Sequence, residues 1–423
     1  MTPEMVIFLV MLGLFVISAM WWKLPIGVSL ILASTAGALT AGEGIPVRHL
    51  VEGSFAYLDP ILIIATAMIF MEVLRKSGAL GSISRLIIIK LHTKPVWLLI
   101  FITLFIMFPG MITGLSTATV LTTGALAAPA MILLGIPALT VAAMIAMSAI
   151  YGMIAPPINV PAMIIGGGVD MPYIGFELPL LFATMPLAFG VNLSLGYKHI
   201  RDVNLQKILP KLGKDHYEKY GFKLFIPLIV VVILMLGVRI IPEYFPNLGV
   251  PFIFMIGSLI GLFCGERMNF WQVSHKAIQE VMPVIGILIG IGAFIQIMTL
   301  TGVRGMLVIG SLSLPDIWRY LSMGTMIPLF GAISAYGSAS VLGVPYLLAF
   351  LGQNEIVVGS ALSLLTGLGD LMPPTALAGI FAAQVVGEKN YFKVLKITII
   401  PAIVTALWAL LMIYFANLLG SFL

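Results

Sequence analysis

The sequence predicts an all-α membrane protein of two inverted repeats, with about ten transmembrane helices, two of them broken, and two re-entrant hairpins. Three observations support this fold class. Hydrophobic residues make up 60% of the chain and charged residues only 9%, whereas about a quarter of the residues of a soluble domain are charged. Long apolar segments recur along all 423 residues, and two of them are interrupted by a double proline.

The uninterrupted apolar segments approach the ~20 residues that cross a bilayer. We expect helices near residues 4–21, 25–41, 60–75, 178–195, 224–241, 250–264, 283–300 and 397–418. The first segment has no basic residue before it and is followed by Trp21, Trp22 and Lys23 instead of a small-residue cleavage site. We therefore expect a retained helix and not a signal peptide.

Segments 138–165 and 355–386 carry the double prolines, Pro156-Pro157 and Pro373-Pro374. Proline lacks the amide hydrogen that a helix needs, and its ring clashes with the preceding turn. Each segment is therefore predicted to form two half-helices joined by unwound backbone, which a membrane tolerates where it lines a cavity or is packed in protein.

Segments 96–133 and 317–351 have Gly, Ser and Thr clustered at their centres, between two apolar arms. We predict that each folds into a re-entrant hairpin. Segments 79–92 and 303–314 are predicted to be interfacial helices.

The two halves resemble each other in sequence. Residues 116–121 match residues 337–342, and Ala155-Pro156-Pro157 matches Met372-Pro373-Pro374, in the same order along the chain. A colinear series of matches indicates duplication. We predict a first repeat at 1–196, a cytoplasmic linker at 197–223 and a second repeat at 224–423. Each repeat crosses the membrane an odd number of times, so the second is inverted.

The basic residues predict the orientation. If the linker is cytoplasmic, all 22 Lys and Arg lie on that face except Arg48, Arg239, Arg304 and Arg319. This division follows the positive-inside rule, which also accounts for the net charge of +5 without an anionic ligand. We therefore expect a multi-pass protein of a bacterial or archaeal cytoplasmic membrane, with both termini outside.

Interrupted helices at matching places in inverted repeats indicate a binding site near the membrane midplane. Helix N-termini at the breaks favour an anion, such as a carboxylate. The predicted substrate-binding residues are Ser116, Thr117, Pro157, Asn159, Gly337, Ser338, Pro374 and Thr375.

Unpaired carbonyl groups at the ends of the first half-helices, together with hydroxyl oxygens, can bind Na⁺. Asp370 lies within a predicted helix, and a charge there needs a partner. The predicted Na⁺ ligands are Gly114, Thr119, Ile154, Ser340, Thr366, Asp370 and Leu371.

Other roles stay open for these residues. Any one of the hydroxyl groups can instead serve close helix packing. Asp370 can bind a proton or accept a structural hydrogen bond, and the Asn159 amide can cap the broken backbone.

Other function classes lack support. The sequence has no phosphate-cradling motif, no cluster with metal-ligand spacing and no nucleophile with a base, and the single cysteine, Cys264, excludes an intrachain disulfide. We expect no enzyme activity, no cofactor, Na⁺ only as a coupling ion, and no nucleic-acid partner. An intramembrane enzyme or a scaffold is the remote alternative.

Three segments resemble a known family: residues 114–119, residues 152–157 and the run from Gly367 to Pro374. They are similar to the large membrane subunit of TRAP transporters, the DctM-like branch of the ion transporter superfamily. The resemblance implies elevator-type import of an organic carboxylate with Na⁺. It also implies two partners, a small four-helix membrane subunit and an extracytoplasmic substrate-binding protein.

The sequence departs from the family pattern at both hairpin tips. Residues 116–130 contain no acidic residue, and the second tip, Ala335-Tyr336-Gly337-Ser338, is atypical. A stand-alone Na⁺- or H⁺-coupled carboxylate symporter of the same superfamily is therefore the alternative.

Overall fold

The computed structural model describes residues 2–200, 216–241, 243–246 and 248–423. Within these ranges every regular element is a helix, apart from an isolated bridge between Leu351 and Gln353. The all-α prediction is confirmed. The division into repeats at 1–196 and 224–423 stays a prediction. Of the predicted linker 197–223, residues 201–215 lie outside the described part of the chain.

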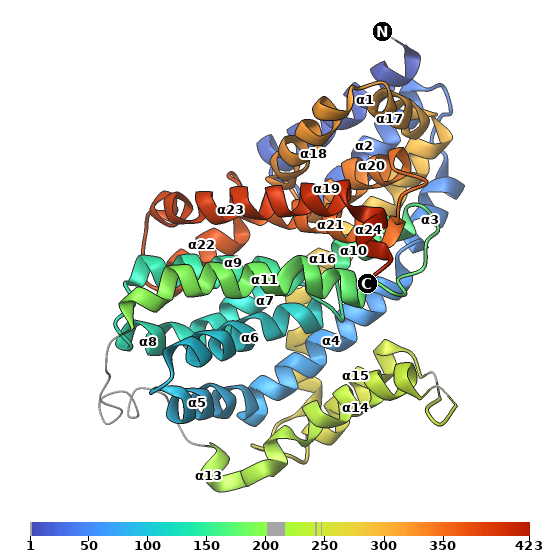
Figure 1. Ribbon diagram of the computed structural model, residues 1–423. Coiled ribbons are helices and arrows are strands. Elements are labelled where there is room, and N and C mark those ends of the chain that lie inside the picture. Colours follow the sequence, from blue (N-terminus) through green and yellow to red (C-terminus); the bar gives the residue numbers. More distant parts are fainter. Residues whose placement is uncertain (1, 201–215, 242, 247) are drawn as a thin grey trace.

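The helices of the two halves follow one another in a similar order (Figure 1). Those of the first half are α1 (Pro3–Val16), α2 (Ile26–Thr40), α3 (Val47–Phe55), α4 (Leu58–Ser77), α5 (Ala79–Leu91), α6 (Pro95–Thr113), α7 (Ser116–Thr119), α8 (Ala125–Leu133), α9 (Ala138–Ile154), α10 (Val160–Gly167) and α11 (Glu177–Gly196). Those that follow are α13 (His216–Tyr220), α14 (Ile226–Ile240), α15 (Val250–Gly261), α16 (Phe270–Leu300), α17 (Val303–Leu312), α18 (Asp316–Gly331), α19 (Ala335–Ser338), α20 (Val344–Ala349), α21 (Glu355–Gly367), α22 (Leu377–Val385), α23 (Tyr391–Tyr414) and α24 (Ala416–Gly420).

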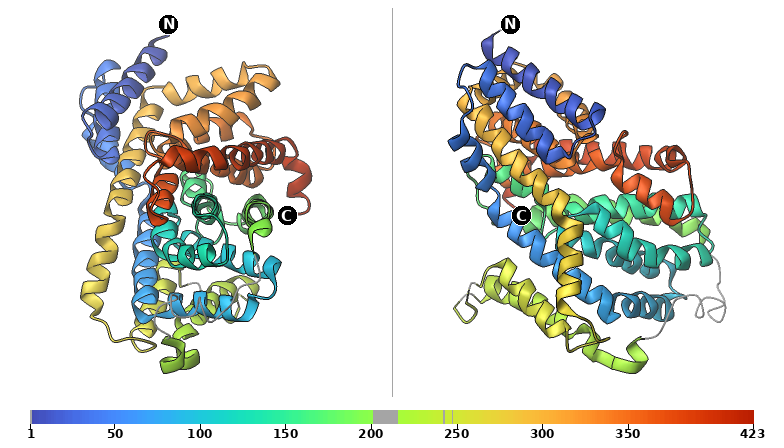
Figure 2. Two further views of the ribbon diagram at one scale, coloured as in Figure 1. Left: turned by 90° about the vertical axis from the view of Figure 1, so that its left-hand side faces the viewer. Right: turned by 180° about the vertical axis from the view of Figure 1, so that it is seen from behind.

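Two layers of helices pack against each other. In the frame layer, α16 packs on α2, α3 and α4, α1 on α2, and α15 on α4 and α14. In the hairpin layer, α9 packs on α6, α11, α22 and α23, and α21 on α10, α18 and α23. Figure 2 shows α16 running along one side of the molecule beside the helices of the first half. Each layer combines helices from both halves of the chain.

Not every predicted span is long enough to cross a membrane as one straight helix. Seven described helices are long and apolar enough to do so, or eight with the bent pair α3–α4, and two of the seven, Pro95–Thr113 and Ser116–Leu133, are the arms of the first hairpin. The apolar helices α2 and α15 have only 15 and 12 residues. At 1.5 Å per residue α2 is about 22 Å long, shorter than the ~30 Å hydrocarbon core.

Helix α16 is much longer than predicted. The apolar pattern predicts a helix at 283–300, but α16 extends over 31 residues, a length of about 46 Å. It begins after Asn269, whose side chain accepts hydrogen bonds from two backbone amides, and it continues through Pro283. A proline inside a helix costs about 3 kcal/mol, which the packing of α16 against α2, α3 and α4 outweighs.

Both predicted hairpins consist of two helical arms. In the first, Thr123 in the second arm donates to the Ile106 carbonyl of α6 over 2.9 Å. In the second, Ser338 donates to the Ile327 carbonyl of α18 over 2.6 Å. Each second arm contains a π-helical turn that ends at a glycine, at Val120–Gly124 and at Ala339–Gly343.

The predicted register between the hairpin tips is wrong by two residues. The second arms begin at Ser116 and Ala335, whereas the sequence match pairs Ser116 with Gly337. The second tip has one more residue between its arms than the first tip, Ala332 to Ser334 against Gly114 and Leu115.

Both predicted broken helices are interrupted at their prolines. The first half-helices end at Ile154 and Leu371, as predicted. The second half-helices begin at Val160 and Leu377, three residues after the second proline of each pair. The cause in the first break is Asn159, which has extended backbone and caps α10 through its side chain.

A glycine contact recurs in both halves. A methyl group added to Gly110 of α6 would lie 2.7 Å from the carbonyl carbon of Gly152. One added to Gly331 of α18 would lie 2.8 Å from the Cα of Gly369. Gly152 and Gly369 each lie four residues before the first proline of their break. The duplication and the opposite orientation of the halves both stay predictions.

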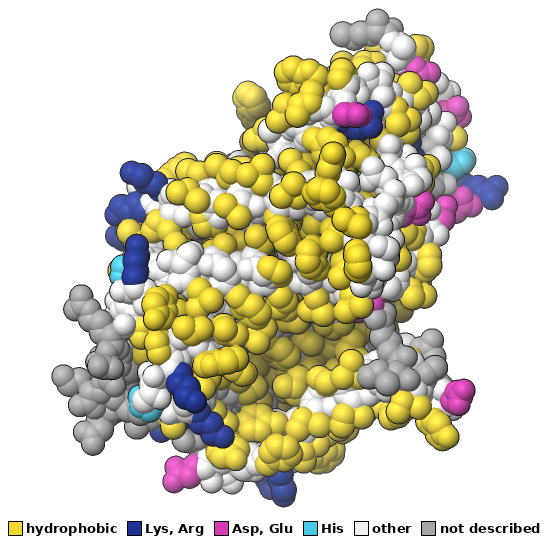
Figure 3. Space-filling view, in the orientation of Figure 1, with side chains coloured by type: hydrophobic (Ala, Val, Ile, Leu, Met, Phe, Trp, Pro, Cys, Tyr) yellow, Lys and Arg dark blue, Asp and Glu magenta, His cyan; other side chains and the backbone are white. Residues whose placement is uncertain are grey.

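The charged side chains gather at the edges of the molecule. In the view of Figure 3, Lys and Arg lie mostly along the left and lower edges, Asp and Glu mostly along the right edge, and hydrophobic side chains cover the area between them. This separation accords with a protein whose middle zone faces lipid.

Candidate functional site

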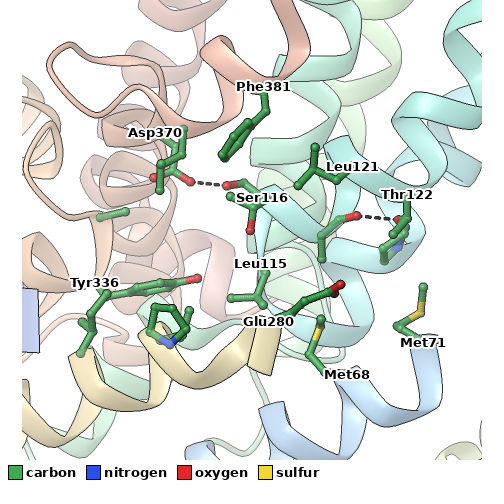
Figure 4. Close-up of a pocket in the computed structure, with 18 of the residues that line it drawn as sticks. Met68, Met71, Leu115, Ser116, Leu121, Thr122, Glu280, Tyr336, Asp370 and Phe381 are labelled. Atoms are coloured by element: carbon green, nitrogen blue, oxygen red, sulfur yellow. Dashed lines mark hydrogen bonds between the residues drawn. The ribbon is translucent and has the colours of Figure 1, made fainter. Parts of the chain in front are cut away.

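A cavity of about 630 Å³ lies between the two layers. From the frame layer, α2, α4 and α16 line it, and from the hairpin layer both hairpin tips, the second break and α22. Its walls are mostly apolar. The polar side chains in the lining are Glu72, Arg75, Ser116, Thr117, Thr122, Lys276, Glu280, Ser334, Tyr336, Asp370 and Thr375. The cavity therefore brings together elements from both halves of the chain (Figure 4).

The first hairpin tip is a tight turn at Gly114 and Leu115. Gly114 has a φ of 69°, a backbone conformation that suits glycine. A methyl group there would also lie 2.4 Å from Cγ2 of Val160. The turn presents Ser116 as the first residue of the second arm, in the cavity lining.

Asp370 lies in the 3-10 turn Leu368–Leu371 at the end of α21 and is 6% exposed. Its carboxylate accepts a short hydrogen bond from the Ser116 hydroxyl, as Figure 4 shows. No described Lys or Arg forms an ion pair with it. A buried carboxylate with one hydroxyl partner has unused acceptor positions.

The second hairpin tip contacts both the first tip and the second break. The Tyr336 hydroxyl donates to the Gly114 carbonyl over 2.9 Å. The Thr375 hydroxyl donates to the Ala332 carbonyl over 2.7 Å. Together with Ser116 and Asp370, these bonds join three of the four unwound segments around one cavity.

Asn159 belongs to the fourth unwound segment and is fully buried. Its side-chain amide nitrogen donates to the Ile154 carbonyl over 2.9 Å and to the Ser363 hydroxyl over 2.8 Å. Its side-chain oxygen accepts from the Ala162 amide over 2.9 Å. Asn159 thus caps the broken backbone, the alternative that the sequence leaves open, and it does not line the cavity.

The predicted residues divide into those in the lining and those outside it. Four of them line the cavity: Ser116, Thr117, Asp370 and Thr375. The remaining predicted residues lie outside the lining and are Gly114, Thr119, Ile154, Pro157, Asn159, Gly337, Ser338, Ser340, Thr366, Leu371 and Pro374.

Several of these outer groups already hold hydrogen bonds. The carbonyl of Leu371 accepts from the Tyr391 hydroxyl, and the hydroxyl of Thr366 donates to the Ser363 carbonyl over 2.7 Å. A carbonyl has two acceptor positions, so Leu371 can still bind an ion. The buried hydroxyl of Ser340 has no partner among the described residues.

A four-charge cluster on the opposite wall was not predicted as part of the site. Glu72 of α4 is 4% exposed in its side chain and pairs with Arg75 over 2.5 Å and with Lys276 of α16 over 3.2 Å. Lys276 also pairs with Glu280 over 3.5 Å. Arg75 follows Glu72 by three residues in the same helix, whereas Lys276 comes to it only through the packing of α16 on α4. The cluster has no net charge and joins α4 to α16.

The polar lining contains no preformed transition-metal site. In the described part of the chain, no group of three His, Cys, Asp or Glu side chains is arranged to hold a metal ion. The lining offers hydroxyl and carboxylate oxygens, which are hard ligands that suit alkali and alkaline-earth cations.

Comparison with known families identifies the chain. Residues 11–419 match the family described as "Tripartite ATP-independent periplasmic transporter, DctM component". The chain belongs to the DctM family. It is therefore a multi-pass membrane protein and a secondary transporter of the TRAP type, a class that works with a small membrane subunit and a substrate-binding protein. No curated protein sequence gives a significant match.

Two solved transporters have a similar fold to this DctM protein. One is the YdaH transporter of Alcanivorax borkumensis, with 15% identity, a TM-score of 0.62 and coverage of 98% of each chain. The other is MtrF of Neisseria gonorrhoeae, described within a class of antimetabolite efflux pumps, with 13% identity and a TM-score of 0.61. The match to MtrF covers 99% of the DctM chain and 98% of MtrF. At these identities the likeness concerns the fold alone.

Proposed function

We propose that this DctM protein imports a small organic carboxylate together with Na⁺, as the large membrane subunit of a tripartite system. The observation that carries the proposal is that both hairpin tips and the second break line one cavity between two layers of helices. The cavity is apolar except for a few converging polar groups, as binding sites for small molecules usually are.

The helix N-termini at the cavity support a carboxylate as substrate. Residues Ser116–Leu133 form one continuous helical arm, and its first residues line the cavity. Helix α22, from the other half, begins at Leu377, which also lines it. The first amides of a helix have no intrahelical partner and carry a partial positive charge, so two such ends favour an anion.

Asp370 supports the coupling to a cation. A substrate carboxylate at the first residues of the Ser116–Leu133 arm would lie close to the Asp370 carboxylate, because only the Ser116 side chain separates them. At a separation of about 5 Å, two negative charges repel by about 3 kcal/mol if the effective dielectric constant is about 20. A bound Na⁺ removes this repulsion. The acid and the ion therefore bind more tightly together than separately, which is the condition for symport.

The two layers support an elevator movement. The hairpin layer contains the binding groups, and the frame layer closes the opposite wall with the Glu72 cluster. In the described part of the chain, one side-chain hydrogen bond joins the frame layer to the hairpin layer away from the cavity, from Tyr57 to the Ile164 carbonyl over 3.1 Å, and Arg304 of the adjoining α17 donates to the Gly168 carbonyl. The hairpin layer can therefore move past α4 and α16 with the loss of few hydrogen bonds between the layers, as an elevator movement requires.

Uptake into proteoliposomes tests this proposal. The chain is reconstituted alone and with the small membrane subunit and binding protein of its system, and a panel of labelled mono- and dicarboxylates is offered. We expect uptake that requires both partners and an inward Na⁺ gradient. Uptake by the chain alone would favour a stand-alone symporter, and uptake driven only by a pH gradient would contradict Na⁺ coupling.

A further inference from the structure

Tyr336 forms a contact that the sequence does not predict. Its hydroxyl donates to the Gly114 carbonyl over 2.9 Å and contacts the Met153 sulfur at 3.9 Å. Gly114 belongs to the first hairpin tip, Met153 to the last turn of α9 and Tyr336 to the second hairpin tip. In the described part of the chain, no other side-chain hydrogen bond joins the two hairpins. One hydroxyl group thus connects three elements of the hairpin layer.

The first tip is held at both of its ends by the second half of the chain. The Gly114 carbonyl accepts from Tyr336, and two residues later the Ser116 hydroxyl donates to Asp370. The carbonyl of Gly114 lies at the C-terminus of α6, where carbonyl groups lack intrahelical partners. Without these two bonds, the tip between α6 and α7 would have no side-chain hydrogen bond to the second half.

The second tip has hydrogen bonds of its own, within the tip and to the second break. Its Ser334 side chain caps the tip by accepting from the Gly337 amide over 3.1 Å. Thr375 in the second break donates to Ala332 over 2.7 Å. The tip that carries Tyr336 is therefore bonded to the second break as well as to Gly114 of the first tip.

We propose that Tyr336 is a positioning residue, which holds the Gly114 carbonyl and thereby fixes the first hairpin tip so that the Ser116 hydroxyl lies against the Asp370 carboxylate in the cavity. The expected effect of Tyr336 on Na⁺ binding rests on the proposed Na⁺ coupling. The fixing of the tip by Tyr336 does not depend on that coupling. When the Tyr336 hydroxyl is removed, the tip keeps only the bond to Asp370 and opens more often. One lost hydrogen bond of ordinary strength corresponds to an increase of about three- to tenfold in the open population.

A cysteine-labelling experiment measures this opening. Cys264 is the only cysteine, so a Cys264→Ser background accepts a single probe. Leu115 lies in the tip, is 4% exposed and lines the cavity, so Leu115→Cys reacts with a maleimide only when the tip opens. Labelling rates are measured on the purified full chain in NaCl and in choline chloride.

The chain offers a matched control in the same hairpin. The Tyr346 hydroxyl donates to the Ser322 hydroxyl over 2.7 Å, between the two hairpin arms. Tyr346→Phe therefore removes a tyrosine hydroxyl from the same hairpin without releasing Gly114. Tyr336→Met serves as a second variant if Tyr336→Phe does not fold, because it fills the space with an apolar, unbranched side chain.

We expect Tyr336→Phe to label about three- to tenfold faster than the parent in choline chloride and to need more Na⁺ for protection, while Tyr346→Phe behaves like the parent. Equal labelling of Tyr336→Phe and the parent would overturn the positioning role, and so would equal acceleration by Tyr346→Phe. Faster labelling of Tyr336→Phe, with no protection of the parent by Na⁺, would support the fixing of the tip and contradict the proposed Na⁺ coupling.

Discussion

Replacing Asp370 with asparagine tests the coupling of the ion to the substrate. The substitution removes one negative charge and keeps the shape of the side chain. The amide oxygen of the introduced asparagine can still accept a hydrogen bond from Ser116, so the contact between the first tip and the second break is weakened but not lost. The main change is therefore electrostatic.

The expected magnitude follows from the repulsion between Asp370 and a substrate carboxylate. A separation of about 5 Å gives about 3 kcal/mol at an effective dielectric constant of about 20. Since 1.4 kcal/mol corresponds to a factor of ten, wild-type protein should bind the acid about a hundredfold more tightly in saturating Na⁺ than in its absence. In Asp370→Asn the repulsion is absent, so the variant should bind the acid without Na⁺ and show less than about a threefold effect of Na⁺.

The assay is the binding of the acid found in the uptake panel to the purified chain, titrated in NaCl and in choline chloride. Asp316→Asn is the matched control, because Asp316 has a side chain that is 85% exposed and lies at the start of α18, outside the cavity lining. It should leave the Na⁺ dependence unchanged. An Asp370→Asn variant that retains the full Na⁺ dependence of the wild type would refute the reasoning.

Two further substitutions test the packing around the site. Gly114→Ala should lower the free energy of unfolding by about 2 kcal/mol or more, because the added methyl group meets Val160 at 2.4 Å and the backbone φ is 69°. Gly81→Ala is the control, because a methyl group added there meets no atom within 4 Å. It should leave the midpoint of thermal unfolding unchanged or raise it. Glu72→Gln should destabilise the chain by about 1–3 kcal/mol, because it leaves Arg75 and Lys276 without the carboxylate that they share. Glu52→Gln is the control, because Glu52 belongs to an exposed ion pair. It should change the free energy of unfolding by less than about 0.5 kcal/mol. Thermal unfolding measures all four variants. Equal midpoints for Gly114→Ala and Gly81→Ala would contradict the first expectation, and equal midpoints for Glu72→Gln and Glu52→Gln would contradict the second.

Much of the fold can be predicted from residues with strong local effects. The double prolines at 156–157 and 373–374 interrupt the helices where expected, because proline removes a backbone donor in any context. Pro283 has the same local chemistry but lies inside α16, since packing against three neighbouring helices outweighs its cost. Local sequence does not distinguish these cases, because the difference lies in what surrounds each proline.

The site could be predicted only in part for a similar reason. Ser116, Thr117, Asp370 and Thr375 are polar residues at chain breaks, and they line the cavity. The bond between Ser116 and Asp370 joins residues 254 positions apart, and no sequence pattern specifies it.

The residues that the sequence did not single out depend on three-dimensional contacts. Tyr336 and the pairing of Glu72 with Lys276 join the two halves of the chain, and only the packing of the halves creates them. Asn159 shows the converse case, because a polar residue beside a break is used here to cap the backbone.

The central claim is that both hairpin tips and the second break form one site for an acid and a cation. An electron-microscopy map of the chain in NaCl with its transported acid tests this most directly. We predict density for the acid at Ser116 and at the start of α22, with a cation against the Asp370 carboxylate. Density for the acid outside this cavity, or Ser116 and Asp370 too far apart to share a ligand, would contradict the claim.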